Sequence, residues 1–410
     1  MATNVDTELA QLVRETTEDF RVNTRVYSDP DIFELEMERI FERGWVFIAH
    51  ESELPNGGDY KTTNIGRQPI IVTRNSDTNQ VHVFFNRCRH RGTTVCQEEF
   101  GQSNFFRCAY HGWVYNSGGE LVGVPKPEGY GKAFKQEELG LTPLPRIKNY
   151  KGFIFGSCSP EGESFEEHMG NALAYLDRFA SLGPDGVSVA PGIHKGVYPG
   201  NWKLQLENTV DGYHFTTLHE GYMKIVSKRA TNPSNYARLQ DQTKTWDLGN
   251  GHAVLEIEPG GLHAKGDPRV PNMVLRHRLG QSGPGYNISV FPNVAFLFSQ
   301  IRVIQPISVD KTEVTLYPIM LKGAEEAINK DLMWEHVDFY GPGGFAAPDD
   351  QEIFSRLQKG FKARGNEWAL FLRGIEYEKA EADGSRWSGQ QDESSQRAIH
   401  RQWKRLMTGA

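Results

Sequence analysis

Two short segments of the chain each combine one cysteine with one histidine. The first reads CRHRG and contains Cys88 and His90, and the second reads CAYHGW and contains Cys108 and His111. Two thiolates and two imidazoles can hold a zinc ion, but zinc fingers pair two cysteines and then two histidines. A two-iron, two-sulfur cluster with thiolates on one iron and imidazoles on the other takes one ligand of each type from each of two loops. The spacing therefore favours a [2Fe–2S] cluster that transfers single electrons, and zinc is the alternative.

A second group of ligand types lies downstream, in the segment GNWKLQLENTVDGYHFTTLH at 200–219. Two imidazoles and one carboxylate on one face of an iron(II) ion leave positions open for O2 and a substrate. His214 and His219 would lie about 140° apart on a regular helix. We therefore expect the helix to end or distort between them if both bind one metal. The alternative is an ordinary helix surface without a metal.

Spacing alone does not select the carboxylate of such a centre. Asp211 can bind the metal directly or hydrogen-bond a ligating imidazole from behind. Further along, the segment PDDQEIF places Asp349 and Asp350 at a predicted helix start. Acids at that position can also simply cap the helix. Asp338 is a further candidate.

The elements that position these residues change in type along the chain. Between 46 and 158, short β-rich runs such as PIIVTR and GFIFGS alternate with turns, which predicts an all-β domain. Outside this domain, apolar residues at helical spacing predict helices, and strand-like runs predict strands. The predicted helices span 7–20, 29–43, 163–181, 200–219, 323–340, 349–364 and 391–407, and the predicted strands lie within 285–320.

The predicted fold class is therefore α+β. An all-β domain of residues 46–158 is inserted near the N-terminus of a second domain, residues 1–45 plus 159–410, which has an antiparallel sheet flanked by helices. The length of 410 residues is sufficient for two such domains.

Composition excludes several classes of partner. A net charge of −7 argues against nucleic acid and an anionic membrane surface. No apolar run reaches the roughly 20 residues that cross a bilayer, and the N-terminus lacks the apolar stretch of a signal peptide.

Only four cysteines occur, which fits a reducing cytoplasm. Cys96 and Cys158 have no partner motif and are expected to be small buried residues. A dinucleotide fingerprint is also missing, so the electrons must come from another protein.

Taken together, CRHRG with CAYHGW, NWKLQLENTVDGYHFTTLH and GPGGFAAPDDQE resemble the large (α) subunits of Rieske non-haem iron ring-hydroxylating oxygenases. The resemblance covers nearly the whole chain. The segments FELEMERIFERGWVFIAHESELP and IGRQPIIVTR are most similar to the group that acts on benzoate and related aromatic acids. The segment between 220 and 285 is shorter than in that group.

The resemblance implies a role for each matching residue. The cluster ligands would be Cys88, His90, Cys108 and His111, and the ligands of the mononuclear iron(II) would be His214, His219 and Asp350, with Asp349 beside the last. Asp211 would link a cluster histidine of one subunit to an iron-bound histidine of the next, which requires a ring-shaped homotrimer. Asn208 would line the iron pocket.

The resemblance also implies a function. The chain would be a cytoplasmic bacterial terminal oxygenase that uses O2 and electrons relayed from NAD(P)H by a reductase, with or without a ferredoxin. It would cis-dihydroxylate an aromatic substrate, an aromatic carboxylic acid in the closest group, in a trimer with or without a small β subunit. A monooxygenase that hydroxylates once or removes N- or O-alkyl groups is the alternative, followed by a pure electron-transfer protein.

An acidic substrate calls for a buried donor to its carboxylate. Arg302, in SQIRVIQP, and Arg276 or Arg278, in LRHRLG, are the candidates in this sequence. The alternative for each arginine is a structural ion pair.

Overall fold

The structure is a computed structural model, and it describes residues 4–222, 224, 243–257 and 285–409. The chain folds into two compact units. The β unit is Phe41–Gly162, and the α+β unit combines Met1–Ile40 with Glu163–Ala410. No helix among the described residues is long and apolar enough to cross a membrane.

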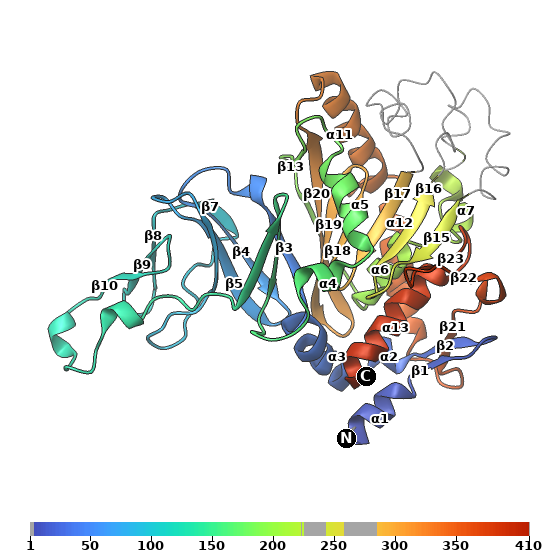
Figure 1. Cartoon of the computed structure of the whole chain (residues 1–410), viewed down its shortest axis with the longest axis horizontal. Coiled ribbons are helices and arrows are strands. Elements are labelled where there is room, and N and C mark those ends of the chain that lie inside the picture. The colour runs from blue at the N-terminus through green and yellow to red at the C-terminus, as the bar shows by residue number, and fades with distance from the viewer. Residues whose placement is uncertain (1–3, 223, 225–242, 258–284, 410) are drawn as a thin grey trace. The chain divides into compact units, whose positions relative to one another are not determined.

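The β unit contains three small antiparallel sheets (Figure 1). Their alternating strands place Ile71, Phe84, Phe106 and Tyr115 in one apolar core together with Cys88, Cys96 and Cys108. The first sheet has the order β6 (Val81–Phe85), β5 (Gln68–Arg74), β4 (Asp59–Ile65) and β7 (Phe100–Gln102). The second has the order β10 (Leu121–Gly123), β9 (Val114–Asn116) and β8 (Phe105–Arg107), and the third β11 (Arg146–Tyr150), β12 (Phe153–Ser157) and β3 (Val46–His50).

The α+β unit is built on one antiparallel sheet, which has ten strands within the described residues. The long strands β19 and β20 lie near one edge, and β14 pairs with β20 beside them. The order is β13 (Val187–Val189), β20 (Lys311–Leu321), β19 (Gln300–Ser308), β18 (Val294–Leu297), β17 (Gly285–Val290), β16 (Ala253–Ile257), β15 (Lys244–Asp247), β23 (Arg386–Gly389) and β22 (Lys379–Ala380), with β14 (His194–Tyr198) on β20.

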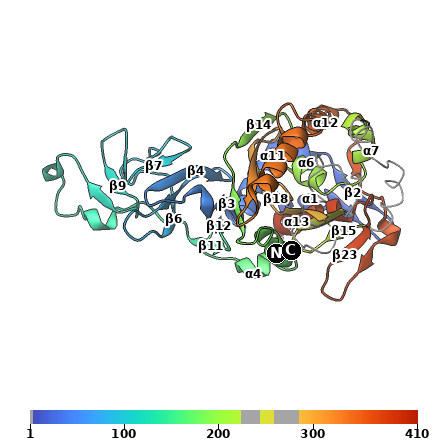
Figure 2. The same cartoon turned by 90° about the horizontal axis from the view of Figure 1, so that it is seen from above.

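Helices cover both faces of this sheet (Figures 1 and 2). On one face, which we call the site face, Ser289 donates a hydrogen bond to the Leu206 carbonyl. On the opposite face Phe296 contacts Phe179. The site face is covered by α6 (Lys203–Thr209), α11 (Glu326–Tyr340), α12 (Ala347–Gly360) and α13 (Ser394–Thr408), and the other face by α4 (Phe165–Met169) and α5 (Ala172–Ala180).

The two ends of the chain meet within this unit. Helix α1 (Asn4–Ala10) packs against α13, and Figure 2 shows both termini side by side. Deeper in the core, Glu36 accepts hydrogen bonds from Trp403 of α13 and from Lys203 of α6. The N-terminal segment is therefore an integral part of the unit that follows the β unit in sequence.

The N-terminal prediction was right for one helix and wrong for the other. The helix predicted over 29–43 is present as α3 (Pro30–Glu36), which continues as a π-helical segment over Met37–Glu42, and Asp29 caps it. The helix predicted over 7–20 ends at Ala10. Thr16 accepts hydrogen bonds from two following backbone N–H groups and turns the chain, so β1 (Val13–Glu15) and β2 (Phe20–Asn23) form a hairpin extended by β21 (Trp368–Leu370).

The later predictions were confirmed in outline. Strands fill 285–320, and α11, α12 and α13 correspond to the three predicted C-terminal helices. The helix predicted over 163–181 breaks at Gly170, which has a φ of 43° and separates α4 from α5. The helix predicted over 200–219 is likewise interrupted, with consequences for the site.

Candidate metal centres

The two cysteine–histidine segments form loops with the same backbone hydrogen bonds. The Cys88 N–H donates to the Thr93 carbonyl at 2.8 Å, and the Cys88 carbonyl accepts from Gly92 at 3.0 Å. In the second loop the Cys108 N–H donates to Trp113 at 2.8 Å, and the Cys108 carbonyl accepts from Gly112 at 3.0 Å.

Each of these loops turns at a glycine in the left-handed region, Gly92 at φ 83° and Gly112 at φ 72°. A Cβ atom added to either glycine would lie within 3.3 Å of a guanidinium nitrogen, from Arg87 in the first loop and Arg107 in the second. The two loops are therefore closely equivalent in structure as well as in sequence.

The side chains of the two loops lie close together in the β unit. Both cysteines are buried, and the rings of His90 and His111 lie 4.4 Å apart between centroids. Trp113 stacks on His90 with an interplanar angle of 7°. The Tyr115 hydroxyl lies 3.3 Å from Cys88 Sγ and accepts a hydrogen bond from the Arg89 N–H, so its own proton is available to a thiolate at Cys88.

This arrangement fits a two-iron cluster better than a single zinc ion. A zinc ion would draw four ligand atoms to one point at about 2.0–2.3 Å. The loop residues do not form such a single-ion group; among the described residues, the one group of this kind lies in the α+β unit. Within the described residues His90 Nδ1 is buried without a hydrogen-bond partner, and the Tyr115 hydroxyl can donate to a cluster thiolate at Cys88.

The second site lies where the predicted helix over 200–219 is interrupted. Helix α6 ends at Thr209, and α7 (Phe215–Leu218) is a single turn. His214 immediately precedes α7 and His219 immediately follows it. The two histidines thus escape the angular separation of a regular helix, and their rings lie 5.2 Å apart between centroids. The expected distortion is present.

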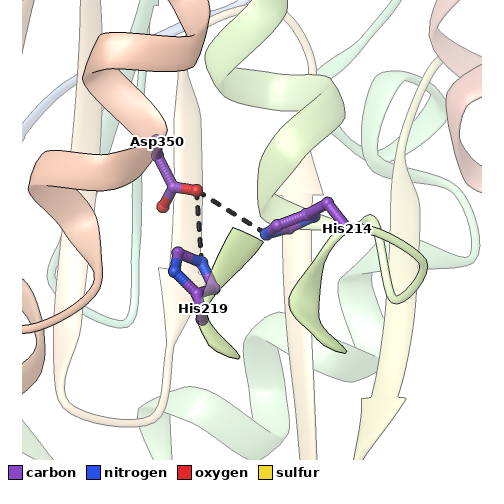
Figure 3. A group of neighbouring side chains, drawn as sticks. All are labelled: His214, His219 and Asp350. Carbon is purple, nitrogen blue, oxygen red and sulfur yellow. Dashed lines mark ion pairs between the residues drawn. The ribbon is translucent and has the colours of Figure 1, made fainter. Parts of the chain in front are cut away.

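Asp350 completes this group from the first turn of α12 (Figure 3). Its Oδ1 atom lies 3.3 Å from His219 Nε2 and 3.6 Å from His214 Nε2. One ligand atom from each of the three residues lies within 4.8 Å of the others. Two imidazoles and one carboxylate at this spacing fit a mononuclear iron(II) with open positions.

Other polar residues surround the group. Asn208 donates to Asp350 Oδ1 at 3.0 Å, and the same amide nitrogen lies 3.4 Å from His214 Nε2. Asp349 is half exposed, and its carboxylate lies 3.8 Å from His219 Nδ1. Asp338, the remaining candidate, does not belong to the three-residue group.

Asp211 lies behind the first histidine. Its Oδ2 atom is 3.5 Å from His214 Nδ1, and its Oδ1 atom accepts from the backbone N–H groups of Tyr213 and His214. Burial raises the pKa of Asp211, but His214 and the two backbone donors outweigh burial and lower it overall. For His214, burial lowers the pKa, but Asp211 and Asp350 together outweigh burial and raise it overall. The pair therefore favours a carboxylate next to an Nδ1–H.

Sequence reasoning missed some residues near the two sites. Tyr115 gave no signal because a tyrosine in a strand is ordinary, and its partner Cys88 is 27 positions away. His336 of α11 and His194 of β14 are fully or partly buried close to Arg302. Arg276 and Arg278 lie outside the described residues. Cys96 is buried as expected, whereas Cys158 is only partly so.

Comparison with protein families accounts for both units. Residues 44–150 match the Rieske [2Fe-2S] domain, and residues 178–409 match the ring hydroxylating alpha subunit (catalytic domain). A loop pair for a cluster and a two-histidine, one-carboxylate group on the same chain define an oxygenase with two iron centres. The chain belongs to the family of ring-hydroxylating oxygenase α subunits.

Curated relatives agree. The chain is 35% identical to the 2-halobenzoate 1,2-dioxygenase large subunit of Burkholderia cepacia, over 87% of this chain and 80% of that protein. It is also 35% identical to the toluate 1,2-dioxygenase α subunit of Pseudomonas putida, over 84% of this chain and 80% of that protein. It is 34% identical to the anthranilate 1,2-dioxygenase large subunit of Acinetobacter baylyi, over 87% of this chain and 82% of that protein.

Solved structures show the same fold. Naphthalene 1,2-dioxygenase with indole bound superposes with a TM-score of 0.84 at 26% identity, covering 97% of this chain and 94% of that one. The Rhodococcus naphthalene 1,2-dioxygenase bound to indole superposes with a TM-score of 0.83 at 27% identity, covering 95% of this chain and 94% of that one. The chain is thus a Rieske non-haem iron oxygenase, whose cofactors are a [2Fe–2S] Rieske cluster and a mononuclear iron and whose co-substrate is O2.

Proposed function

We propose that this chain cis-dihydroxylates an aromatic carboxylic acid as the terminal component of an electron-transfer chain. The observation that carries the proposal is the convergence of His214, His219 and Asp350 in a chain whose relatives are 2-halobenzoate, toluate and anthranilate 1,2-dioxygenases. When bound, the two iron centres supply single electrons and the activation of O2. The remaining tasks fall to the side chains around them.

We assign the cluster to a domain of residues 46–158 and its ligands to the two equivalent loops. Cys88 and Cys108 bind one iron, and His90 and His111 bind the other. The catalytic domain comprises 1–45 and 159–410. Support comes from the buried thiols, the paired imidazoles and the Rieske match over 44–150.

The mononuclear iron is assigned to His214 Nε2, His219 Nε2 and Asp350. Asn208 holds Asp350 in place by its hydrogen bond and borders the open side of the group. A carboxylate behind each imidazole, Asp211 at one and Asp349 at the other, favours the Nδ1–H tautomer and leaves the Nε2 lone pair for the metal.

Asp211 is further assigned as the bridge to a cluster histidine of a neighbouring subunit in a homotrimer. Its side chain remains 30% exposed although it faces His214, and the adjacent Tyr213 is 51% exposed. A carboxylate can accept from N–H groups on two sides, so the exposed side of Asp211 can receive a second imidazole. Asp211 would then link the cluster of one subunit to the iron site of the next through hydrogen bonds.

A separate reductase, with or without a ferredoxin, feeds the cluster, and the enzyme acts in the cytoplasm. A small β subunit is a further candidate partner. Native mass spectrometry of the purified enzyme distinguishes a homotrimer from an assembly with a second polypeptide. Either assembly accommodates the bridge, whereas a monomer with full turnover would exclude it.

The test of the proposed function combines Asp211 variants with a panel of benzoate, 2-chlorobenzoate, anthranilate and the neutral arene toluene, assayed with a surrogate reductase. We expect a cis-diol from benzoate, and from the two ortho-substituted acids a catechol formed by loss of CO2 together with chloride or ammonia. Asp211→Ala should abolish turnover while cluster and iron content stay unchanged. Glu352→Gln, at an exposed carboxylate of α12 that pairs with Arg356, serves as the matched control. Normal turnover by Asp211→Ala would exclude the bridge, and products from neutral arenes alone would exclude the acid substrate.

A further inference from the structure

Arg302 stands on the site face of the sheet, in the middle of β19. It pairs with Ala295 on β18 and with Leu316 on β20, and only 4% of its surface is exposed. The covering helix α6 lies directly over it, since Arg302 Nη1 donates to Thr209 Oγ1 at 3.1 Å. The guanidinium is therefore held in the space between the sheet and the helices that carry the metal group.

This guanidinium has almost no hydrogen-bond partners. Among the described residues the bond to Thr209 is its one hydrogen bond, it forms no ion pair, and its Nε is buried without a partner. Burial lowers the pKa of Arg302, and Tyr340 and Asp350 oppose that shift only in part. Burying a cation without an adjacent anion costs several kcal/mol of free energy. An anion bound next to Arg302 would recover part of that cost.

A buried arginine in the same unit shows what a structural role looks like. Arg397 is fully buried on α13 and donates to the carboxylate of Glu378, to the Phe371 and Arg373 carbonyls and to Ser394. Its donors are saturated by protein. Arg302 differs in that, within the described residues, Thr209 is the one hydrogen-bond partner of its guanidinium.

Neighbouring groups add a second donor that is also unpartnered. Across the sheet, the row Ala295, Arg302, Leu316 continues to His194 on β14, and His194 contacts His336 of α11 at 5.1 Å between ring centroids. Both ring nitrogens of His336 are buried and have no hydrogen-bond partner in the part of the chain that the structure describes. Burial lowers its pKa to about 3, with His194 and Arg302 adding to the effect. His336 is therefore neutral and offers one N–H.

An aromatic ring also lies beside the guanidinium of Arg302. Tyr340 lies one turn beyond His336 on α11, and its ring centroid is 5.4 Å from the Arg302 guanidinium carbon. This distance is compatible with a cation–π contact, which leaves the in-plane N–H groups available.

The link to the metal group is short. Thr209, which fixes Arg302, directly follows Asn208, which donates to Asp350. We propose that Arg302 is the anchor for the carboxylate of the aromatic substrate, with His336 as its second donor. A carboxylate held here by the planar fork of Arg302 directs the attached ring into the space beside His214, His219 and Asp350. The proposal rests on the proposed function and specifies which residue selects the acid.

The experiment measures binding by calorimetry on the cluster- and iron-loaded enzyme, with benzoate and with its neutral isostere benzamide. Variants are Arg302→Gln, Arg302→Lys and, as a matched control, Arg356→Gln, an exposed arginine paired with Glu352 on α12. Loss of one charge-assisted hydrogen bond should raise the benzoate dissociation constant about 10- to 150-fold in Arg302→Gln. Benzamide binding should change less than threefold, and Arg302→Lys should recover part of the benzoate affinity because it keeps the charge.

The outcomes separate the two proposals. If wild type binds and hydroxylates benzoate and Arg302→Gln does so equally well, the anchor is wrong while the acid-oxygenase function stands. If wild type ignores benzoate but hydroxylates toluene, the acid substrate is wrong and the anchor falls with it. If Arg302→Gln loses iron or cluster, the fully loaded Arg302→Lys variant is compared with wild type instead. The anchor is wrong if this variant loses as much affinity for benzamide as it loses for benzoate.

Discussion

The Oδ2 atom of Asp211 lies 3.5 Å from Nδ1 of His214, the ring nitrogen on the side away from Asp350. A similar relation, at 3.8 Å, joins Asp349 to Nδ1 of His219. Each imidazole thus has a carboxylate behind it and Asp350 in front. Such outer carboxylates fix the tautomer and raise the basicity of a ligating histidine. The two differ in setting, since Asp349 is half exposed and Asp211 is more enclosed by its backbone donors.

Removal of the front carboxylate should remove one iron and spare the cluster. We expect Asp350→Ala to contain one iron fewer per chain than wild type, because two imidazoles alone hold iron(II) weakly. Metal analysis together with the visible and EPR spectra of the reduced cluster measures this. Glu352→Gln, an exposed carboxylate on the same helix, is the control and should keep full iron. Retention of full iron by Asp350→Ala would contradict the ligand assignment.

The hydroxyl of Tyr115 should raise the reduction potential of the cluster. It lies 3.3 Å from Cys88 Sγ, and a donor to a thiolate stabilises the more negative, reduced state. Tyr115→Phe should therefore lower the midpoint potential by roughly 20–60 mV, the equivalent of one ordinary hydrogen bond. Spectroelectrochemistry of the purified enzyme measures the shift. Tyr130→Phe, a partly exposed tyrosine near Trp113, should leave the potential unchanged; an equal shift in both variants would point to a nonspecific effect.

The contributions of the buried residues Glu36 and Lys203 to the free energy of unfolding should be strongly coupled. Glu36 accepts from Lys203 at 2.6 Å and from two tryptophan N–H groups, and both charged residues are fully buried. Lys203→Met leaves a buried carboxylate without its cation and should destabilise the α+β unit by about 3–5 kcal/mol. The double variant with Glu36→Gln should recover part of that loss. Urea denaturation gives the values, and strictly additive losses would argue against coupling.

Acid should destabilise the α+β unit through His252. Burial lowers its pKa to about 3, with His168 contributing. Its Nε2 lies 2.8 Å from the His168 carbonyl, and Nδ1 accepts from the Phe291 N–H at 3.1 Å, so the folded state holds the neutral ring. The unfolded chain takes up the proton near pH 6.5. Stability contributed by this group is thus present above about pH 6.5 and is lost as the pH falls toward 3.

The corresponding measurement is the denaturation midpoint at pH 7.5, 6.5, 5.5 and 4.5. His252→Gln should be less stable than wild type at pH 7.5, because it disturbs two buried hydrogen bonds, and should lose less on acidification. His82→Gln, a partly buried histidine on β6 in the β unit, serves as the control. The same pH slope in wild type and His252→Gln would exclude His252 as the acid-sensitive group.

Sequence reasoning reached the two metal groups because their ligands repeat short spacings that few other arrangements require. It also anticipated the break between His214 and His219, since a regular helix cannot direct both to one metal. The choice of Asp350 over Asp338 depended on resemblance: 131 positions separate Asp350 from His219, and only the packing of α12 against the site face brings them together.

Other features depended on contacts that no local pattern encodes. The helix predicted over 7–20 failed because Val13 and Val22 face each other across a hairpin that completes its sheet with a strand from the C-terminal region. Arg302 was one of three candidate arginines in the sequence. Its distinction from Arg397 is that it has fewer hydrogen-bond partners among the described residues, and no sequence pattern encodes that difference.

The union of the two chain ends in one unit has a consequence for synthesis on the ribosome. The β unit is continuous in sequence, so its residues have all been translated long before the chain is complete. Glu36 must wait for Trp403, 367 residues later, and at about 5–20 residues per second that delay is roughly 20–70 s. During this interval the first 40 residues remain an unpaired half of a core. Cluster insertion can therefore precede closure of the iron domain in the life of each newly made chain.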